Sequence, residues 1–405
     1  MKIIHTSDWH LGKNLEGNSR LSEQRQFADF FVEKCDEIKP DLVIIAGDIY
    51  DTPNPPAMAE KLFYDTLKRL SRKGECMTLV IAGNHDNPER LVAAWPLAME
   101  QGILMLGTPK TVAQTGNYGN HQVTDSGQGY IELDINGEKA VILAVSYPSE
   151  KRLNEIIYQD DQSEEERLLT YGDKIKEIFG SLEENFREDT INITVSHLFA
   201  FGAEEAGSER NISLGGSFIV PTSYLPQSAH YTALGHIHKP QVLPGTKGKM
   251  IYSGSPVHYN KSEPKTNKKF FEINVKAFEE AQIEAHEIPI FKPIEIWESG
   301  CIDHALALCE KNQAQDSWVY LEIKTDRYIR DDEIKQMKSL KADILEIKPI
   351  IQAIEEETNY EQISEMSFLD QFKEFYKAQK DADASEEIIS TLVSILEEEF
   401  EDETN

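Results

Sequence analysis

The chain has 405 residues, which is too long for one hydrophobic core and predicts two or three domains. Its formal net charge of −30 argues against nucleic-acid binding through a broad basic surface. It has no apolar run of about 18 residues and no CxxC spacing among its four cysteines, so we expect no membrane span, no zinc knuckle and a reducing, cytoplasmic location.

The first 270 residues contain five short apolar, β-branched runs that each end abruptly in polar residues. Apolar runs of this length predict strands that are buried on both faces of a sheet. Amphipathic helical patterns lie between them, at 20–38 and 57–73, so this region indicates a layered α/β fold. The five runs are KIIHTSDWH (2–10), DLVIIAGDIYD (41–51), TLVIAGNHD (78–86), INITVSH (191–197) and YTALGHIH (231–238).

The region from 287 to 350 has a different pattern, in which three strand-like segments alternate with two helical ones. This order predicts a small α+β domain that follows the larger one. An acidic stretch at 355–357 then separates it from a C-terminal tail. We therefore divide the chain into three predicted domains, at residues 1–280, 285–350 and 358–405.

The tail consists of two amphipathic helical patterns, at 367–380 and 385–400. About fifty residues cannot easily bury a core by themselves. We therefore expect the tail to dock on a partner protein, with packing against its own chain as the alternative. The candidate partner contacts are its apolar positions, among them Phe368, Leu369, Phe372, Phe375, Leu392 and Leu396.

Each of the five predicted strands ends in side chains that can bind a metal ion. Ligands of open α/β sheets collect outside the carboxyl ends of the strands, so these side chains can converge on one crevice. Asp, Asn and His without Cys favour a divalent ion, with Mn²⁺ first and Fe²⁺ or Zn²⁺ as alternatives. Two ions that share one carboxylate would use all seven ligands. These are Asp8, His10, Asp48, Asn84, His197, His236 and His238.

Each motif taken alone also has a purely structural explanation. An Asp-x-His sequence after a strand can be a turn, and a single histidine such as His197 can be a hydrogen-bonded core residue. The GNHD sequence at 83–86 can be an Asx turn, because Asn and Asp are common in turns. The joint occurrence of the motifs at five strand ends nevertheless favours a metal centre.

Together the motifs resemble the calcineurin-type metallophosphoesterase superfamily. The similarity lies in DxH (8–10), GDxxD (47–51), GNHD (83–86), the strand-end His197 and GHxH (235–238). Within the superfamily, HTSDWHLG, GDIYDTPNPP, LGHIHKPQ and YSGSPVHYN are similar to the nuclease subunits of bacterial complexes that repair double-strand breaks in DNA. The resemblance implies a layered metallophosphoesterase β-sandwich flanked by helices, a small α+β capping domain and a helical tail.

The resemblance also implies roles for individual residues. His85 corresponds to the histidine that meets the scissile phosphate or protonates the leaving oxygen. Asp51 corresponds to the carboxylate that orients this histidine, with Asp86 as the alternative. One ion would be held by Asp8, His10, Asp48 and His238, and the other by Asp48, Asn84, His197 and His236, with Asp48 as the bridge.

The implied activity is a metal-dependent nuclease, acting as an exonuclease on duplex ends and an endonuclease on hairpins or single strands. A small-molecule phosphodiesterase or phosphatase, or a scaffold subunit, stays open because the metal site does not set substrate size. Two divalent ions outweigh two carboxylates, so the site attracts phosphate inside an acidic protein. Candidate phosphate contacts, or else ordinary solvated side chains, are Lys13, Arg90 and Lys239, then Arg20, Lys261, Lys265, Lys268 and Lys269.

The partners follow from the same resemblance. They are DNA, a second copy of the chain, and an SMC-like ATPase that binds the C-terminal tail, together forming a heterotetramer. The implied processes are DNA repair, replication and recombination. The helical regions at 57–73 and 89–101 are candidate dimer contacts, and we expect no membrane partner.

Overall fold

The computed structural model describes residues 1–153, 164–209, 219–263, 266–351 and 389. Chain contacts divide it into two units, one of residues 1–324 and 329–349 and the other of residues 325–328 and 350–405. The first unit contains almost all of the described helices and strands. The predicted tail helices, with their candidate partner contacts, lie outside the described residues.

The first sheet has six strands and contains the first three predicted runs. Its strands β1, β4, β5 and β6 are parallel, as helical crossovers between successive strands require, whereas β17 and β18 add an antiparallel hairpin at one edge. Because β18 lies beyond residue 280, this sheet extends past the first proposed domain boundary. Across the sheet the order is β18 (Gln282–Glu287), β17 (Lys269–Asn274), β1 (Lys2–Thr6), β4 (Leu42–Ala46), β5 (Met77–Ile81) and β6 (Ile103–Leu106).

The second sheet has eight strands and contains the last two predicted runs as β11 and β14. Strands β10, β11, β14 and β16 are parallel, and antiparallel strands complete both edges. The order is β15 (Gln241–Val242), β16 (Met250–Tyr252), β14 (Tyr231–Gly235), β11 (Ile191–His197), β10 (Glu138–Val145), β9 (Tyr130–Ile135), β8 (His121–Gly127) and β7 (Gly116–Tyr118).

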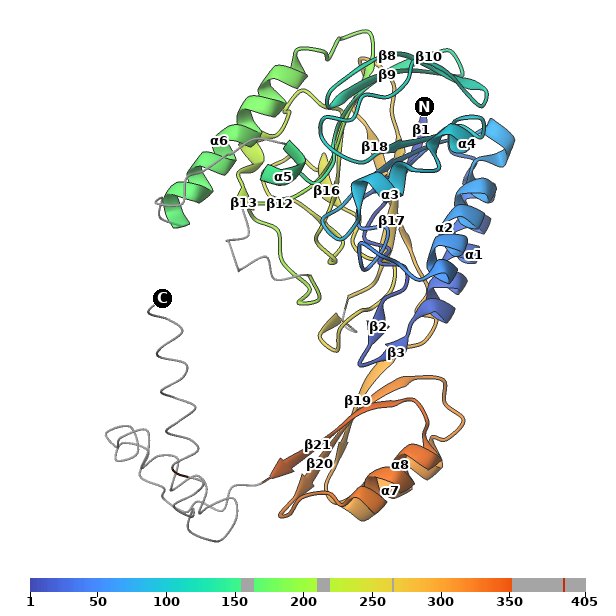
Figure 1. Cartoon of the computed structure of the whole chain (residues 1–405), viewed down its shortest axis with the longest axis vertical. Coiled ribbons are helices and arrows are strands. Elements are labelled where there is room, and N and C mark those ends of the chain that lie inside the picture. The colour runs from blue at the N-terminus through green and yellow to red at the C-terminus, as the bar shows by residue number, and fades with distance from the viewer. Residues whose placement is uncertain (154–163, 210–218, 264–265, 352–388, 390–405) are drawn as a thin grey trace. The chain divides into compact units, whose positions relative to one another are not determined.

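The two sheets pack face to face, and helices cover their outer faces. Apolar side chains such as Ile44 and Ile193 fill the space between the sheets. Phe27 and Phe63 of two helices pack on the outer face of the first sheet, and Phe179 packs on that of the second. Figure 1 shows these helices on opposite sides of the sheets, so the predicted layered α/β fold is confirmed. The helices are α1 (Leu21–Ile38), α2 (Ala57–Leu70) and α6 (Glu164–Glu183).

Short elements complete the connections in this unit. None of the helices among the described residues is long and apolar enough to cross a membrane. The short helices are α3 (Pro88–Val92), α4 (Trp95–Met99), α5 (Glu150–Leu153), η1 (Arg72–Gly74) and η2 (Thr222–Tyr224), and the short strands are β2 (Asn14–Leu15), β3 (Asn18–Ser19), β12 (Phe199–Ala200) and β13 (Ile219–Val220).

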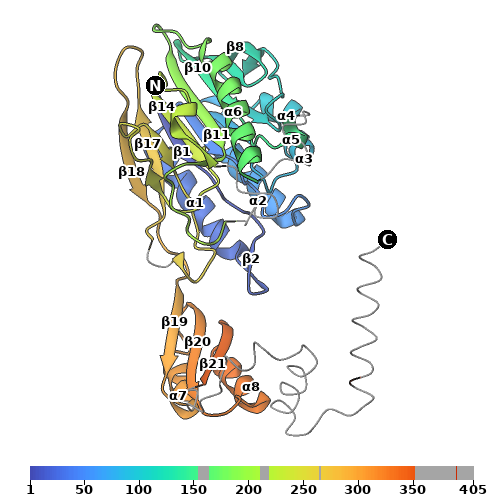
Figure 2. The same ribbon diagram turned by 90° about the vertical axis from the view of Figure 1, so that its left-hand side faces the viewer.

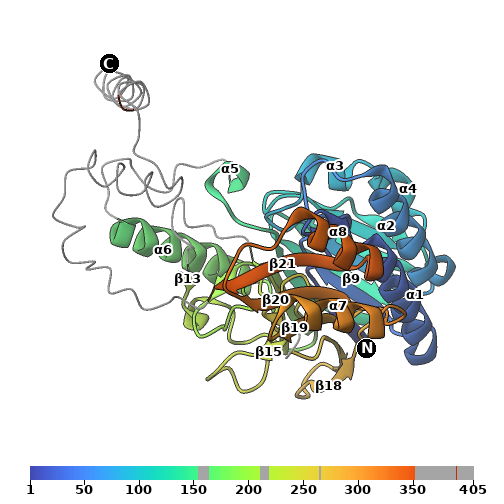
Figure 3. The same ribbon diagram turned by 90° about the horizontal axis from the view of Figure 1, so that it is seen from below.

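A third, three-stranded sheet corresponds to the predicted α+β region. Two helices cover one of its faces, and their Ala305 and Met337 pack with Leu321 of the central strand (Figures 2 and 3). The indole of Trp318 donates a 2.7 Å hydrogen bond to the carboxylate of Glu23 in α1. The limits of the three domains remain a proposal. The elements are β19 (Ile294–Ser299), β20 (Trp318–Thr325), β21 (Ile344–Ile351), α7 (Ile302–Lys311) and α8 (Asp331–Leu340), in the strand order β19, β20, β21.

Candidate metal centre

The seven predicted ligands lie at the carboxyl ends of strands from both sheets. In the first sheet they follow β1, β4 and β5, and in the second they end β11 or follow β14. The two edges meet closely, because Nδ1 of His197 in β11 donates a 2.9 Å hydrogen bond to the carbonyl oxygen of Ala46 in β4. The packing of the sheets therefore brings five sequence-distant loops to one place.

The glycines of the strand-end motifs permit this close approach. A Cβ atom at Gly235 would overlap the carbonyl oxygen of Ala46, and one at Gly83 would overlap the carboxylate and backbone nitrogen of Asp48. Only a residue without a side chain fits at these two positions. The glycines of GNHD and GHxH are thus required by the contact between loops.

Several predicted ligands have unusual backbone conformations. Asp8, His10, Asp48 and His236 have φ values of 53°, 43°, 50° and 104°, all in the left-handed region. Such residues cost about 1–3 kcal/mol each and persist where the surrounding structure holds them, often at functional sites. Here the loops hold one another: the backbone N–H of Asp8 donates to the carbonyl of Gly47, and that of His10 donates to the carbonyl of Asp48, both at 3.0 Å.

The first ligand group, which we call site A, consists of Asp48, Asn84, His197 and His236. Oδ1 of Asn84 lies 3.0 Å from Nε2 of His197 and 3.0 Å from Nδ1 of His236. Oδ2 of Asp48 lies 3.4 Å from Nε2 of His197. Ligand atoms about 2.1 Å from one ion and about 90° apart are separated by about 3 Å, so these spacings suit a shared divalent ion.

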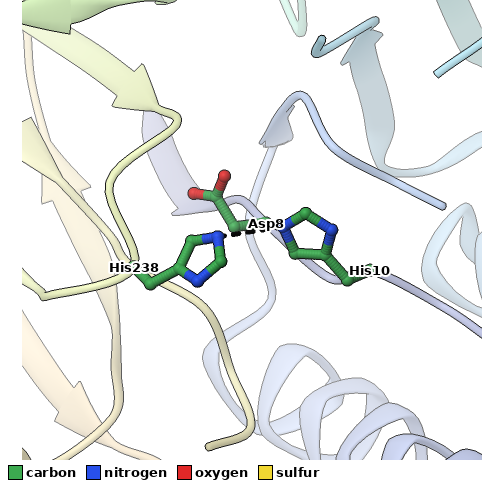
Figure 4. A group of neighbouring side chains, drawn as sticks. All are labelled: Asp8, His10 and His238. Atoms are coloured by element: carbon green, nitrogen blue, oxygen red, sulfur yellow. Dashed lines mark hydrogen bonds between the residues drawn. The ribbon is translucent and has the colours of Figure 1, made fainter. Parts of the chain in front are cut away.

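The second group, site B, consists of Asp8, His10 and His238, whose side chains turn toward one another (Figure 4). Nε2 of His10 lies 3.0 Å from Nε2 of His238 and 3.6 Å from Oδ2 of Asp48. The carboxylate of Asp48 therefore borders both sites. Asp8 also fixes the loop after β14, because its Oδ1 accepts a 2.9 Å hydrogen bond from the backbone N–H of His236.

The protonation states suit metal binding. Burial lowers the pKa of His10 and His238 well below the usual value and that of His236 to about 3, so these imidazoles are neutral. Burial raises the pKa of Asp48, but the charges of His197 and His85 outweigh it and hold this pKa well below its usual range. A buried, ionised carboxylate needs positive charge beside it.

The other two titrating ligands agree with a need for positive charge. Burial raises the pKa of Asp8 to about 7, against the lowering effect of His197. Burial lowers the pKa of His197, but the Asp48 carboxylate outweighs this and raises it to about 9. Neutral imidazoles, carboxylates and an amide oxygen are ligands for borderline-hard divalent ions. The residues present therefore fit two such ions.

Two ligand histidines are oriented by hydrogen bonds from their far nitrogens. His197 uses Nδ1 for the carbonyl of Ala46, and Nδ1 of His238 lies 2.6 Å from Oγ of Ser208. These bonds leave Nε2 of each ring directed at the ligand groups, which is the usual arrangement around metals. Glu209 adds a second contact, because its Oε1 accepts a 2.9 Å hydrogen bond from the backbone N–H of His238. The sequence analysis missed Ser208 and Glu209, since no spacing distinguishes them from other loop residues.

His85 lies beside both sites and is held by its backbone as well as its ring. Its backbone N–H donates a 2.9 Å hydrogen bond to Oδ1 of Asp48, and its Nδ1 donates a 2.7 Å bond to the carbonyl oxygen of Asp51. Its ring packs edge-on to that of His10, with centroids 4.7 Å apart. The structure thus supplies an orienting group for His85 from the main chain.

The two aspartates considered for orienting His85 have other contacts. The carboxylate of Asp51 pairs with Nζ of Lys13 at 2.8 Å, and that of Asp86 accepts backbone hydrogen bonds from Ile49, Tyr50 and Gly83. Among the described contacts, neither carboxylate reaches the imidazole of His85. Asp86 instead ties the loop after β4 to the loop after β5.

The predicted phosphate contacts differ in their surroundings. Lys13 lies at the site through its pair with Asp51, whereas Arg90 pairs with Glu60 at 2.8 Å and Lys239 pairs with Glu204. Arg20 and Lys268 are buried and bonded to protein groups, so their assignment as phosphate contacts is wrong. Lys261 pairs with Glu346, and Lys265 lies outside the described residues.

Comparison with known proteins gives matches along most of the chain. A family model described as calcineurin-like phosphoesterase matches residues 1–240, and one described as type 5 capsule protein repressor C-terminal domain matches residues 290–380. A curated relative, the SbcD subunit of nuclease SbcCD from Bacillus subtilis (strain 168), is 36% identical over 381 residues, which are 94% of this chain and 93% of the relative.

Two solved structures are more distant. A dimetal phosphatase from Danio rerio matches with a TM-score of 0.39 and 10% identity over 72% of this chain and 97% of its own. A novel archaeal phosphodiesterase matches with a TM-score of 0.30 and 11% identity over 71% of this chain and 99% of its own. The family assignment therefore depends on the sequence matches.

Proposed function

This chain belongs to the calcineurin-like phosphoesterase family, and within it to the SbcD nuclease subunits, and from that premise we propose that it is a metal-dependent DNA nuclease. The observation that carries the proposal is the place of Asp48 between the two ligand groups. Its Oδ2 lies 3.4 Å from Nε2 of His197 in site A and 3.6 Å from Nε2 of His10 in site B. A carboxylate shared between two ligand groups is typical of two-metal phosphodiester hydrolysis.

We propose that site A and site B each hold one divalent ion and that Asp48 bridges them. The mixture of carboxylate, amide and imidazole ligands favours Mn²⁺. When bound, the two ions neutralise charge on the phosphoryl oxygens and activate water for in-line attack on phosphorus. Two divalent ions against the carboxylates of Asp8 and Asp48 leave about two positive charges, which attract a phosphate despite the acidic surface.

His85 is the proposed catalytic residue. The carbonyl of Asp51 accepts the hydrogen bond from Nδ1, so the ring presents Nε2 toward Oδ2 of Asp48 at 4.0 Å. In its protonated form this nitrogen can donate to the scissile phosphate or give its proton to the leaving oxygen. Asp51 then acts through its main-chain carbonyl, while its carboxylate holds Lys13 where a neighbouring phosphate can be bound.

DNA is the proposed substrate because the relative is named a nuclease subunit. We propose exonuclease activity on duplex ends and endonuclease activity on hairpins or single strands. The processes served would be DNA repair, replication and recombination. A small-molecule phosphodiesterase or phosphatase is the second candidate, since the ligand groups would serve either substrate. A pure scaffold is disfavoured because all seven predicted ligands lie together.

The proposed partner is an SbcC-type SMC-like ATPase, since the relative is a subunit of SbcCD. We propose that the tail at 358–405 binds it, and that two copies of this chain join within a heterotetramer. The cytoplasm is the proposed location. The four cysteines, all of them within the described residues, are unpaired, as expected in a reducing compartment.

A nuclease assay tests the proposed function. The purified chain with Mn²⁺ should cleave blunt duplex, hairpin and single-stranded DNA and a chromogenic phosphodiester, because the reacting bond is the same in all of them. A phosphomonoester should be a poor substrate. Chelation should remove the activity and added Mn²⁺ should restore it. Hydrolysis of the small esters with none of the DNA substrates would instead favour the phosphatase alternative.

Deletion of residues 358–405 tests the partner proposal. The shortened chain should still cleave the chromogenic phosphodiester, because every proposed ligand precedes residue 239. It should lose co-purification with the ATPase and ATP-stimulated cleavage of duplex DNA. Phe372→Glu with Phe375→Glu should reproduce this loss, because charge in an apolar interface is costly.

The matched control is Lys373→Glu, which adds the same charge between these two positions but at a polar residue. It should bind the ATPase normally. If the deletion instead abolishes cleavage of the small phosphodiester, the tail belongs to the enzyme's own fold and the docking proposal is withdrawn.

A further inference from the structure

The loop after β5 determines the geometry of site A. It carries Asn84, whose Oδ1 contacts His197 and His236, and His85, whose backbone N–H contacts Asp48. A small shift of this loop would therefore move the ligand oxygen of Asn84 and the imidazole of His85 together. Whatever holds the loop controls both.

Arg152, in the short helix α5 that follows β10, holds both ends of this loop. Its Nη1 donates to the carbonyl oxygen of Gly83 and its Nη2 to that of Asp86, both at 2.6 Å. A guanidinium has two parallel donors with fixed separation, so one side chain can bind the two carbonyls that flank Asn84 and His85. The side chain is partly buried, which strengthens these charge-assisted bonds.

The same guanidinium also supports the opposite wall of site A. It lies over the ring of Tyr147, 5.4 Å from the ring centroid. The Tyr147 ring is stacked at 6.4 Å and 25° on His236 and lies edge-on to His197 at 6.2 Å. Arg152 thus contacts, directly or through one ring, the loop of Asn84 and both histidines of site A.

Site B has a different set of supports. Ser208 and Glu209 bind the ring and backbone of His238. Among the contacts of the described residues, none joins Arg152 to Asp8, His10 or His238. The supports of the two sites are therefore separable by substitution.

We infer that Arg152 is a positioning residue for the ion in site A and for His85, and that it does not serve the ion in site B. The inference rests on the proposed two-ion function. It predicts that loss of the guanidinium changes one of two Mn²⁺ affinities, a result that a general loss of stability would not give.

The test is a calorimetric Mn²⁺ titration of Arg152→Gln, Arg152→Lys and the full-length parent. Arg152→Gln should weaken one binding phase about 10–100-fold and leave the other within about threefold, as expected for a lost support of a metal ligand. Its kcat on the chromogenic phosphodiester should fall about 10–100-fold with little change in KM, since the group acts after substrate binding. Arg152→Lys, which can reach one carbonyl, should recover part of both effects.

Two controls make the result specific. Lys151→Gln removes the exposed cation next to Arg152 in the same helix and should leave both phases and kcat unchanged. Ser208→Ala should weaken the other binding phase, so that Arg152→Gln and Ser208→Ala together weaken both.

The inference is overturned if both phases of Arg152→Gln match those of the parent, or if both weaken equally with a lowered melting temperature. Failure of the proposed function would look different. In that case the parent would bind Mn²⁺ in two phases and hydrolyse no phosphodiester, while the selective effect of Arg152→Gln on one phase would remain.

Discussion

Asp48→Asn should reduce hydrolysis to background and lower the bound Mn²⁺ from two ions to one or none. Asp48 is 2% exposed and borders both sites through one oxygen, while its other oxygen accepts the backbone N–H of His85. The amide has no charge and replaces an acceptor by a donor, so neither ion keeps its shared anionic ligand. Elemental analysis of the dialysed protein beside a phosphodiester assay measures both effects.

The matched control is Asp65→Asn, the same chemical change at an exposed position of α2 where the carboxylate forms only a surface pair with Lys61. That variant should keep two ions and full activity. Two equivalents of tightly bound Mn²⁺ in Asp48→Asn would remove this carboxylate from its bridging role.

His85→Ala should lower kcat by about two to four orders of magnitude and leave both Mn²⁺ affinities nearly unchanged, as expected for a lost general acid or transition-state contact. The ions should stay because His85 supports Asp48 through its backbone N–H, which alanine retains. Binding of DNA should also be nearly unchanged. Single-turnover kinetics, Mn²⁺ titration and a DNA-binding isotherm separate these quantities.

His304→Ala is the control, since this exposed histidine of α7 bonds only Ser299 among the described contacts. It should behave as the parent chain. Loss of one ion from His85→Ala would mean that the imidazole is itself a ligand, and its proposed catalytic role would have to be abandoned.

Local sequence patterns were sufficient for the layered fold and the order of the main strands. The apolar run at 191–197 coincides with β11, and the helical pattern at 20–38 coincides with α1 to within one residue. Such runs are predictable because burial on both faces, or on one stripe of a helix, is written in consecutive residues. The meander β7–β10 was not predicted, since its half-buried strands are short and interrupted by turns.

The sequence by itself also determined which residue types stand at the five strand ends, and hence the chemistry of a divalent-metal centre. It could not determine which atoms meet. The carbonyl rather than the carboxylate of Asp51 binds His85, and Arg20 and Lys268 are buried. Arg152 reaches the loop after β5 from a chain segment more than 60 positions away. Only the tertiary structure decided these contacts, because the packing of two sheets sets distances between loops that no local periodicity encodes.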